Sequence, residues 1–90
     1  MLTGTTSSGF EYSLDEDTLN DMELVDLMVE VQKDSENIRA TMEFYERIIG
    51  TEQKKRLYDH LRDENGRVPV KQYFLECTEM VKALKEKGKN

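Results

Sequence analysis

Apolar side chains recur with a helical period along most of the chain, and they are densest between residues 21 and 33. The apolar positions there are Met22, Leu24, Val25, Leu27, Met28, Val29 and Val31, which cover more than one face of a helix. Asn20 or Asp21 can cap this helix at its start, and Lys33 suits the helix dipole at its end. A helix with so much apolar surface either lies at the centre of the core or presents its second face to another protein.

Two further helices are expected on either side of Gly50. The first is capped by Asp34 or Ser35, ends at Gly50, and carries the apolar side chains Ile38, Met42, Phe44, Tyr45, Ile48 and Ile49. Thr51 is expected to cap the second, whose apolar positions are Leu57, Tyr58 and Leu61. Because its apolar positions are so few, most of this third helix is expected to lie at the surface.

A fourth helix is predicted from about Val70 to Lys87. Its apolar residues alternate at spacings of four and three, which is the pattern of a narrow coiled-coil seam, and they are Val70, Phe74, Cys77, Val81 and Leu84. Tyr73 and Met80 flank this seam. The seam covers fewer than three heptads, so the pattern favours packing against another helix of the same chain.

The stretch LRDENGRVPV, residues 61–70, separates the third helix from the fourth and partly resembles a calcium-binding loop. With Gly66 at the sixth position of such a loop, Asp63 and Asn65 fall at ligand positions, but the first and twelfth positions lack their carboxylates. We therefore interpret the stretch as a boundary between helices. The third helix is expected to run to about Asp63, Asn65 and Gly66 to adopt the left-handed conformation, and Pro69 to fall in the first turn of the fourth helix.

The N-terminal part of the chain lacks a helical period. Residues 1–9 are small and polar, which predicts a flexible leader. The next five residues, FEYSL, alternate and place Phe10, Tyr12 and Leu14 on one side, which is typical of a short strand or an extended arm. Because a lone strand is unstable, it must lie on the helices, pair with a second copy, or become ordered with a partner.

These elements predict an all-α fold: a compact antiparallel bundle of about four helices, with an extended N-terminal arm or short strand. Residues 10–88 are expected to form a single helical domain. The chain has 90 residues and a net charge of −6, with 12 acidic and 3 basic side chains in residues 1–49 and 7 acidic and 10 basic ones in residues 50–90. This charge difference would help copies to associate, and we expect a homo-oligomer.

Reactive side chains are few. Cys77 is the single cysteine and lies on the expected inner face of the fourth helix, so we expect a buried, reduced thiol rather than a partner for His60. The carboxylates of residues 15–17 and the basic side chains of residues 54–56 are expected to be solvated. No phosphate-binding glycine loop or second histidine is present. The sequence therefore predicts no catalysis, metal or cofactor, no nucleic-acid binding, and no membrane span.

Two segments resemble a known family. FEYSLDEDTLNDMELVDLM, followed by IIGTEQKKRLYDHLRDENGRVPV, is similar to small proteins of siphophages and prophages of Gram-positive bacteria, with LYDHLRDENGRVPV the most specific part. These proteins are similar to tail assembly chaperones of the lambda-like kind. The resemblance covers residues 10–75 and departs from the family pattern around DSENIRAT, where a proline is expected.

The resemblance implies a function without catalysis. Many copies would bind the tape measure protein, keep it soluble, and help to recruit tail tube subunits through a frameshifted longer form. It also implies a location in the cytoplasm of the bacterial host and absence from the mature virion. The partner-binding residues that we expect are apolar helix positions, namely Leu24, Leu27, Met28, Tyr73 and Met80.

A regulatory, DNA-binding protein is the alternative. The third helix, the ENG turn and the fourth helix could be read as a helix-turn-helix motif. That motif normally has a shorter turn and a basic recognition helix. Residues 70–87 carry four lysines against three glutamates, so the fourth helix is not strongly basic. Its charge therefore favours the chaperone over the DNA-binding alternative.

Overall fold

The computed structural model describes residues 1–87, and the chain begins in it with a β-hairpin rather than a flexible leader. Strand β1 (Leu2–Thr5) pairs antiparallel with strand β2 (Glu11–Leu14), and Gly4 lies opposite Tyr12. The leader expected over residues 1–9 is therefore wrong for residues 2–5. The sequence of β1 has no apolar alternation, because the inward positions are Leu2 and a glycine.

The hairpin lies against the helices, with one face of β2 turned into the core. Phe10, Tyr12 and Leu14 are all buried, which confirms the side of β2 predicted from its alternation. Thr6 donates its backbone N–H to Phe10 and closes the hairpin turn. The sequence left three ways to stabilise this strand: packing on the helices, pairing with a second copy, or ordering with a partner. In the structure β2 packs on the helices of its own chain and also pairs with β1.

Four α-helices follow the hairpin, as the sequence predicts. A short 3₁₀ helix, η1 (Glu16–Leu19), leads into α1 (Met22–Lys33), α2 (Ile38–Ile49), α3 (Thr51–Leu61) and α4 (Val70–Lys87). The compact helical part is thus confirmed, whereas the all-α class is corrected to a mostly helical fold with a two-stranded hairpin. Residue 88, the expected end of the helical domain, lies outside the described residues.

Short-range hydrogen bonds set the helix ends, and two of the predicted caps, those of α2 and α3, are wrong. Asp21 caps α1 by accepting a hydrogen bond from the N–H of Glu23, as expected. Asn37 caps α2, and not Asp34 or Ser35, because Asp34 belongs to the end of α1. Gly50, at a φ of 85°, ends α2 and directly precedes α3.

Thr51 does not cap α3. The cap position is held by Gly50, and no side chain of residues 1–87 caps this helix. Thr51 is its first residue, and its hydroxyl donates to Glu46 of α2. The tight α2–α3 corner therefore depends on the left-handed glycine at position 50.

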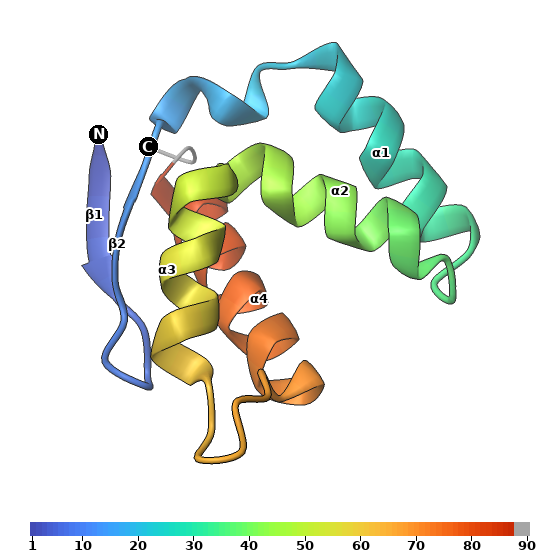
Figure 1. Ribbon diagram of the computed structural model, residues 1–90. Helices are drawn as coiled ribbons and strands as arrows, with labels where there is room; N and C mark the ends of the chain where they lie inside the picture. Colours follow the sequence, from blue (N-terminus) through green and yellow to red (C-terminus); the bar gives the residue numbers. More distant parts are fainter. Residues whose placement is uncertain (88–90) are drawn as a thin grey trace.

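Helix α1 lies at the edge of the fold and not at its centre. It runs back along α2, away from the unit formed by α3, α4 and the hairpin (Figure 1). Leu24 is its one fully buried residue. The central position considered for this helix is therefore wrong, and two of its apolar side chains, Met22 and Val29, are exposed.

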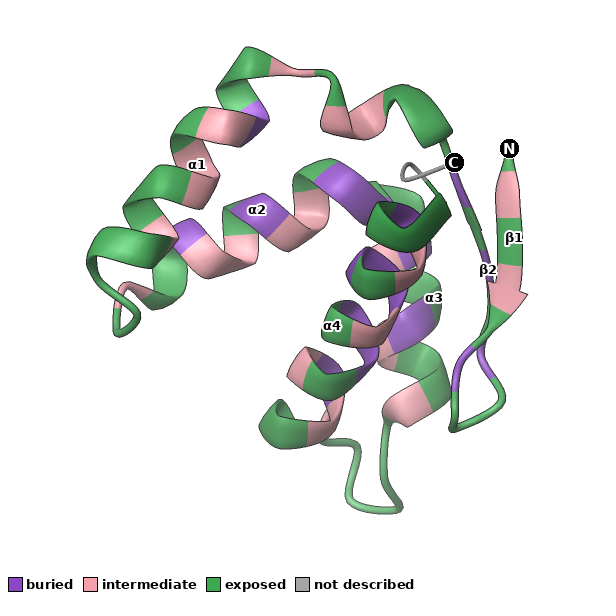
Figure 2. Cartoon of the chain, turned by 180° about the vertical axis from the view of Figure 1, so that it is seen from behind, coloured by how far each residue is buried: buried purple, intermediate pink, exposed green. Residues whose placement is uncertain are grey.

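The core forms where α2, α3, α4 and the hairpin meet (Figure 2). Its buried apolar residues are Phe10, Tyr12, Leu14, Leu24, Phe44, Ile48, Ile49, Leu57, Tyr73, Cys77, Met80, Val81 and Leu84. The inner face of α4 is rotated from the predicted seam towards Tyr73 and Met80. As a result Val70 is exposed and Phe74 is only partly buried.

The loop between α3 and α4 uses its polar groups to bind itself. Helix α3 ends at Leu61, and α4 begins directly after Pro69. The carboxylate of Asp63 accepts hydrogen bonds from the backbone N–H groups of Asn65 and Arg67. Gly66 is left-handed, with a φ of 80°, as predicted, whereas Asn65 is not.

Candidate partner-binding surface

An apolar stripe on the outer side of α1 is the first candidate site. Met22, Val25 and Val29 are spaced by three and four residues, so they share one side of the helix. The opposite side, with Leu24, Leu27, Met28 and Val31, packs on the core. Met22 is 70% exposed and Val29 40% exposed. We call Met22, Val25 and Val29 the α1 stripe.

The α1 stripe borders an apolar hollow. This hollow has a volume of about 190 Å³ and lies between α1, η1, α2 and the end of α4. Its lining residues are Leu19, Leu24, Val25, Met28, Phe44 and Lys85. Val25 belongs to both features, so the stripe and the hollow form one apolar surface large enough for the side chain of a bound helix.

The five predicted partner-binding residues are divided between core and surface. Leu24, Tyr73 and Met80 are buried, so their side chains are not available to a partner in this conformation. Leu27 and Met28 are partly buried between α1 and α2. Met22 and Val29, which are exposed, were not among the predicted residues, although the second apolar side of α1 is the signal that could have identified them.

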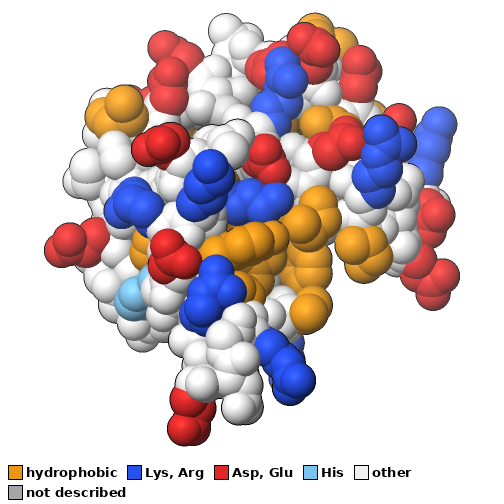
Figure 3. Space-filling view, in the orientation of Figure 1, with side chains coloured by type: hydrophobic (Ala, Val, Ile, Leu, Met, Phe, Trp, Pro, Cys, Tyr) orange, Lys and Arg blue, Asp and Glu red, His pale blue; other side chains and the backbone are white. Residues whose placement is uncertain are grey.

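A second apolar area lies where α2, α3 and α4 meet. The rings of Tyr45 and Phe74 lie 6.0 Å apart, and Phe74 in turn contacts Tyr73 at 5.5 Å. Figure 3 shows hydrophobic side chains gathered in one patch in this region. The Tyr45 hydroxyl is 3.1 Å from the Thr78 hydroxyl. Tyr45 and Phe74 are partly buried and lie against the core, in which Tyr73 is buried, so this area is more tightly packed than the α1 stripe.

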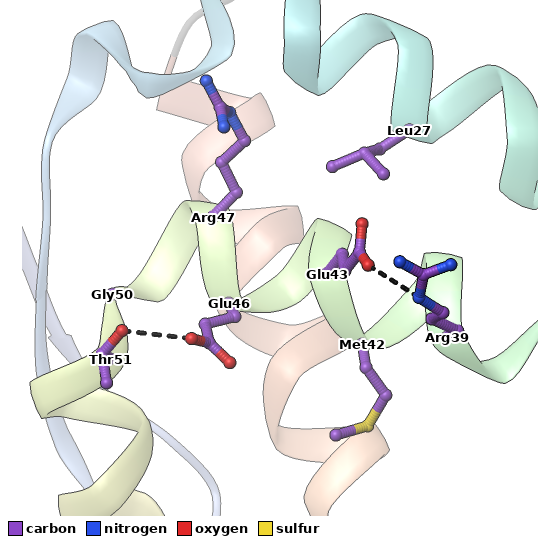
Figure 4. Close-up of a pocket in the computed structure, with 8 residues that line it drawn as sticks. All are labelled: Leu27, Arg39, Met42, Glu43, Glu46, Arg47, Gly50 and Thr51. Atoms are coloured by element: carbon purple, nitrogen blue, oxygen red, sulfur yellow. Dashed lines mark hydrogen bonds and ion pairs between the residues drawn. The ribbon is translucent and has the colours of Figure 1, made fainter.

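A shallow, charged hollow of about 470 Å³ lies over α2 (Figure 4). Its charges are paired: Arg39 lies 3.1 Å from Glu43, and Glu46 lies 2.8 Å from Lys54. The hydrogen bond from Lys54 holds the pKa of Glu46 below its usual value. Because these carboxylates already have cations beside them, the hollow offers little to a charged ligand.

Arg47 connects α2 to the start of α1. Its Nε lies 2.6 Å from Asp21, and its second contact, at 3.2 Å, is with Glu23. The hydrogen bond from Arg47 lowers the pKa of Asp21, which also caps α1. This contact therefore fixes the peripheral helix, and with it the α1 stripe, to the rest of the fold.

A polar cluster joins the hairpin turn to α3 and α4. Glu76 is fully buried, and its Oε1 accepts hydrogen bonds from the hydroxyls of Thr6 (2.5 Å) and Ser8 (2.6 Å). Its Oε2 has no hydrogen-bond partner among the residues that the structure describes. His60 Nε2 lies 3.1 Å from Ser8 Oγ.

The cluster resembles a catalytic triad in composition but not in geometry. In a triad the acid holds the histidine, whereas here Glu76 and His60 both contact Ser8. Ser7 extends the contact, since its backbone N–H and its hydroxyl both donate to Glu79. The arrangement therefore ties the hairpin turn to the helices. Cys77 is a buried free thiol and has no hydrogen bond to His60 or Ser8 among residues 1–87, and burial raises its pKa to about 11.

Comparisons of the chain with protein-family models, curated proteins and solved structures gave no match. Within residues 1–87, no group of three or more histidine, cysteine or acidic side chains is placed to hold a metal ion. None of the helices in that part of the chain combines the length and the apolar character needed to cross a bilayer.

Proposed function

We propose that this chain is a tail assembly chaperone that binds the tape measure protein and keeps it soluble, without catalysis. The observation that carries the proposal is the α1 stripe, an exposed apolar helix surface beside an apolar hollow. The resemblance of FEYSLDEDTLNDMELVDLM and LYDHLRDENGRVPV to a phage protein family supports the choice of client.

The geometry suits an amphipathic helix as the bound segment. Such a helix buries apolar anchors at spacings of three and four residues, and the α1 stripe presents apolar side chains at the same spacings. Burial of this surface contributes about 25 cal/mol per Å². Glu23, Asp26 and Glu30 flank the stripe, so a client helix with basic side chains beside its apolar face fits best.

The other parts of the function belong to the same proposal. Several copies act together on one client, because the tape measure protein is long. Tail tube subunits are recruited through a frameshifted longer form of the chain. The protein works in the cytoplasm of the bacterial host and is absent from the mature virion.

The DNA-binding alternative has weaker support from the geometry. A helix-turn-helix motif joins its helices by a turn of about three or four residues. Here eight residues, 62–69, separate α3 from α4. The exposed surface of α4 also mixes Lys82, Lys85 and Lys87 with Glu86, which is a poor electrostatic match to a phosphate backbone.

Co-expression with the tape measure protein tests the proposal. The native chain should move the tape measure protein from the insoluble to the soluble fraction and retain it on an affinity column. A Met22→Lys, Val29→Lys double variant should lose this activity and keep its helical circular dichroism, because both side chains are exposed.

Leu75→Lys is the matched control. Leu75 is 53% exposed on α4, away from the α1 stripe, so this variant should still rescue the client. Equal rescue by the native chain and the double variant would exclude the α1 stripe as the binding surface. A native chain that never binds the tape measure protein, but shifts a promoter fragment at physiological salt, would instead favour the DNA-binding alternative.

A further inference from the structure

The two edges of the hairpin differ in their hydrogen bonding. On β2, the backbone N–H and C=O of Ser13 point away from β1, and both are bound by the side-chain amide of Gln53 on α3, at 2.9 and 3.0 Å. Gln53 is itself buried. The far edge of β2 is therefore closed at this position by a side chain that bonds as a neighbouring strand would.

The outer edge of β1 is open. In an antiparallel pair, successive residues point their backbone groups alternately towards and away from the partner strand. Ser13 points away from β1, so Thr3, its partner in the register, points away from β2, and so does Thr5. Within residues 1–87, the N–H and C=O groups of Thr3 and Thr5 have no hydrogen-bond partner outside the hairpin. In both views β2 lies between β1 and α3, and no element covers the other side of β1 (Figures 1 and 2).

This edge carries no charged residue or proline that would oppose strand pairing. Proteins protect edge strands with lysine, proline, bulges or a covering loop. The residues of β1, LTGT, include no charge and no proline, and they pair with β2 in continuous register. Thr3 and Thr5 are exposed and β-branched, so they suit a strand surface.

We propose that β1 is an interface between two copies of this chain, in which the two β1 strands pair antiparallel and join the hairpins into one four-stranded sheet. The two-fold axis passes beside Gly4, so that Thr3 of each copy faces Thr5 of the other. Antiparallel pairing of identical edges is what a two-fold axis produces. The occupant is a second copy because Thr3 and Thr5 lie symmetrically about Gly4, so a two-fold axis brings the free groups of one β1 opposite the same groups of the other.

Three observations select this register. Pairing Thr3 with Thr5 uses the N–H and C=O of both residues and stays within β1. A shift that paired Thr5 with itself would place Thr3 opposite Ser7, whose N–H is already bound to Glu79. The central position is Gly4, which has no side chain to obstruct the two strands where they approach most closely.

Sedimentation of the chain alone tests the interface, so it does not rest on the proposed function. The native chain should form a dimer at micromolar concentration. Thr3→Pro removes the outward N–H and no hydrogen bond within the hairpin, so this variant should sediment as a monomer and keep the far-UV circular dichroism of the native chain. Thr3→Val is the matched control: it changes the same side chain, keeps the N–H, and should remain a dimer.

Disulfide formation tests the register. Thr3 and Thr5 of opposite copies would have Cα atoms about 5.5 Å apart, within the range of a disulfide. Two Thr3 residues would lie diagonally, at about 7–8 Å. A mixture of Thr3→Cys and Thr5→Cys chains should therefore cross-link under mild oxidation, whereas neither variant should cross-link alone.

Native chains that sediment as monomers, or a dimer that Thr3→Pro leaves intact, would overturn the interface. Cross-linking of Thr3→Cys alone would overturn the register. Because no client is present in either measurement, failure here is distinct from failure of the chaperone proposal.

Discussion

The ring of Tyr12 lies against Gly4 across the hairpin. A Cβ atom placed on Gly4 would lie 2.5 Å from the Tyr12 hydroxyl oxygen and 2.6 Å from the ring carbon that carries it. The two residues are direct partners in the register, and both are on the side of the hairpin that faces the helices. The glycine in β1 is therefore required by the aromatic side chain opposite it.

Gly4→Ala should consequently destabilise the protein. Strand propensity alone would favour alanine by roughly 0.5–1 kcal/mol, but the collision with Tyr12 should cost about 1–3 kcal/mol, so the net effect is a loss. Denaturant unfolding measures it. In a Tyr12→Leu background the colliding atoms are absent, and Gly4→Ala should then become neutral or stabilising. The same loss in both backgrounds would show that the ring is not responsible.

The buried carboxylate of Glu76 predicts unequal effects for two adjacent threonines. Thr6→Val removes a hydroxyl that donates to Glu76 and also accepts from the N–H of Phe10, so the free energy of unfolding should fall by about 1–3 kcal/mol. Thr5→Val, at the exposed neighbouring position, should change it by less than about 0.5 kcal/mol. Thermal and urea unfolding of the two variants provide the comparison, and similar values would contradict a stabilising role for the contact.

The α3–α4 loop should be sensitive at Gly66 and tolerant at Pro69. No atom would obstruct a side chain at Gly66, so the cost of Gly66→Val arises from its φ of 80° and should be about 1–3 kcal/mol. Pro69 precedes the first residue of α4, and Pro69→Ala should change the free energy of unfolding little. A harmless Gly66→Val variant would mean that the loop adopts another conformation.

The contact between Asp21 and Arg47 should appear in the pH dependence of stability. A pKa that is lowered by folding contributes stability above the unfolded pKa, and this stability is lost as the pH falls through the folded pKa. Arg47→Gln should therefore reduce stability at neutral pH, and the difference from the native chain should shrink below about pH 4.

A carboxyl titration by NMR gives the direct measurement. In Arg47→Gln the pKa of Asp21 should rise towards its ordinary value. The pKa of Glu46, which is lowered by Lys54, should stay low and serves as the control. An unchanged pKa of Asp21 would exclude the hydrogen bond from Arg47 as its cause.

Features set by neighbouring residues in the sequence could be predicted, whereas features set by distant partners could not. The four helices, the caps at Asp21 and Gly50, and the buried side of β2 all follow from short patterns. Strand β1 does not, because its inward glycine makes sense only opposite Tyr12. The apolar content of α1 was visible, but periodicity does not say how many neighbours a helix has.

The same limit applies to the candidate surface. Tyr73 and Met80 flank the apolar seam of α4, and the sequence does not reveal whether the core lies on their side. Contacts such as that between Tyr73 and Tyr58, whose ring centroids lie 5.2 Å apart, decide it. The burial of Glu76 could not be predicted for a related reason. Glu76 lies between Tyr73 and Met80 on the inner side of α4, and its carboxylate is accommodated there by the hydroxyls of Thr6 and Ser8 in the hairpin turn.

The side-chain amide of Gln53 has a consequence for the size of any assembly. A hairpin with two free edges can add copies at both, and repeated addition gives a fibre. With its β2 edge closed at Ser13 by Gln53, this hairpin has a single growing end. When the β1 edges of two copies pair with each other, neither is free to add a third copy. The contact of Gln53 with Ser13 therefore limits the sheet to two copies and prevents a polymer.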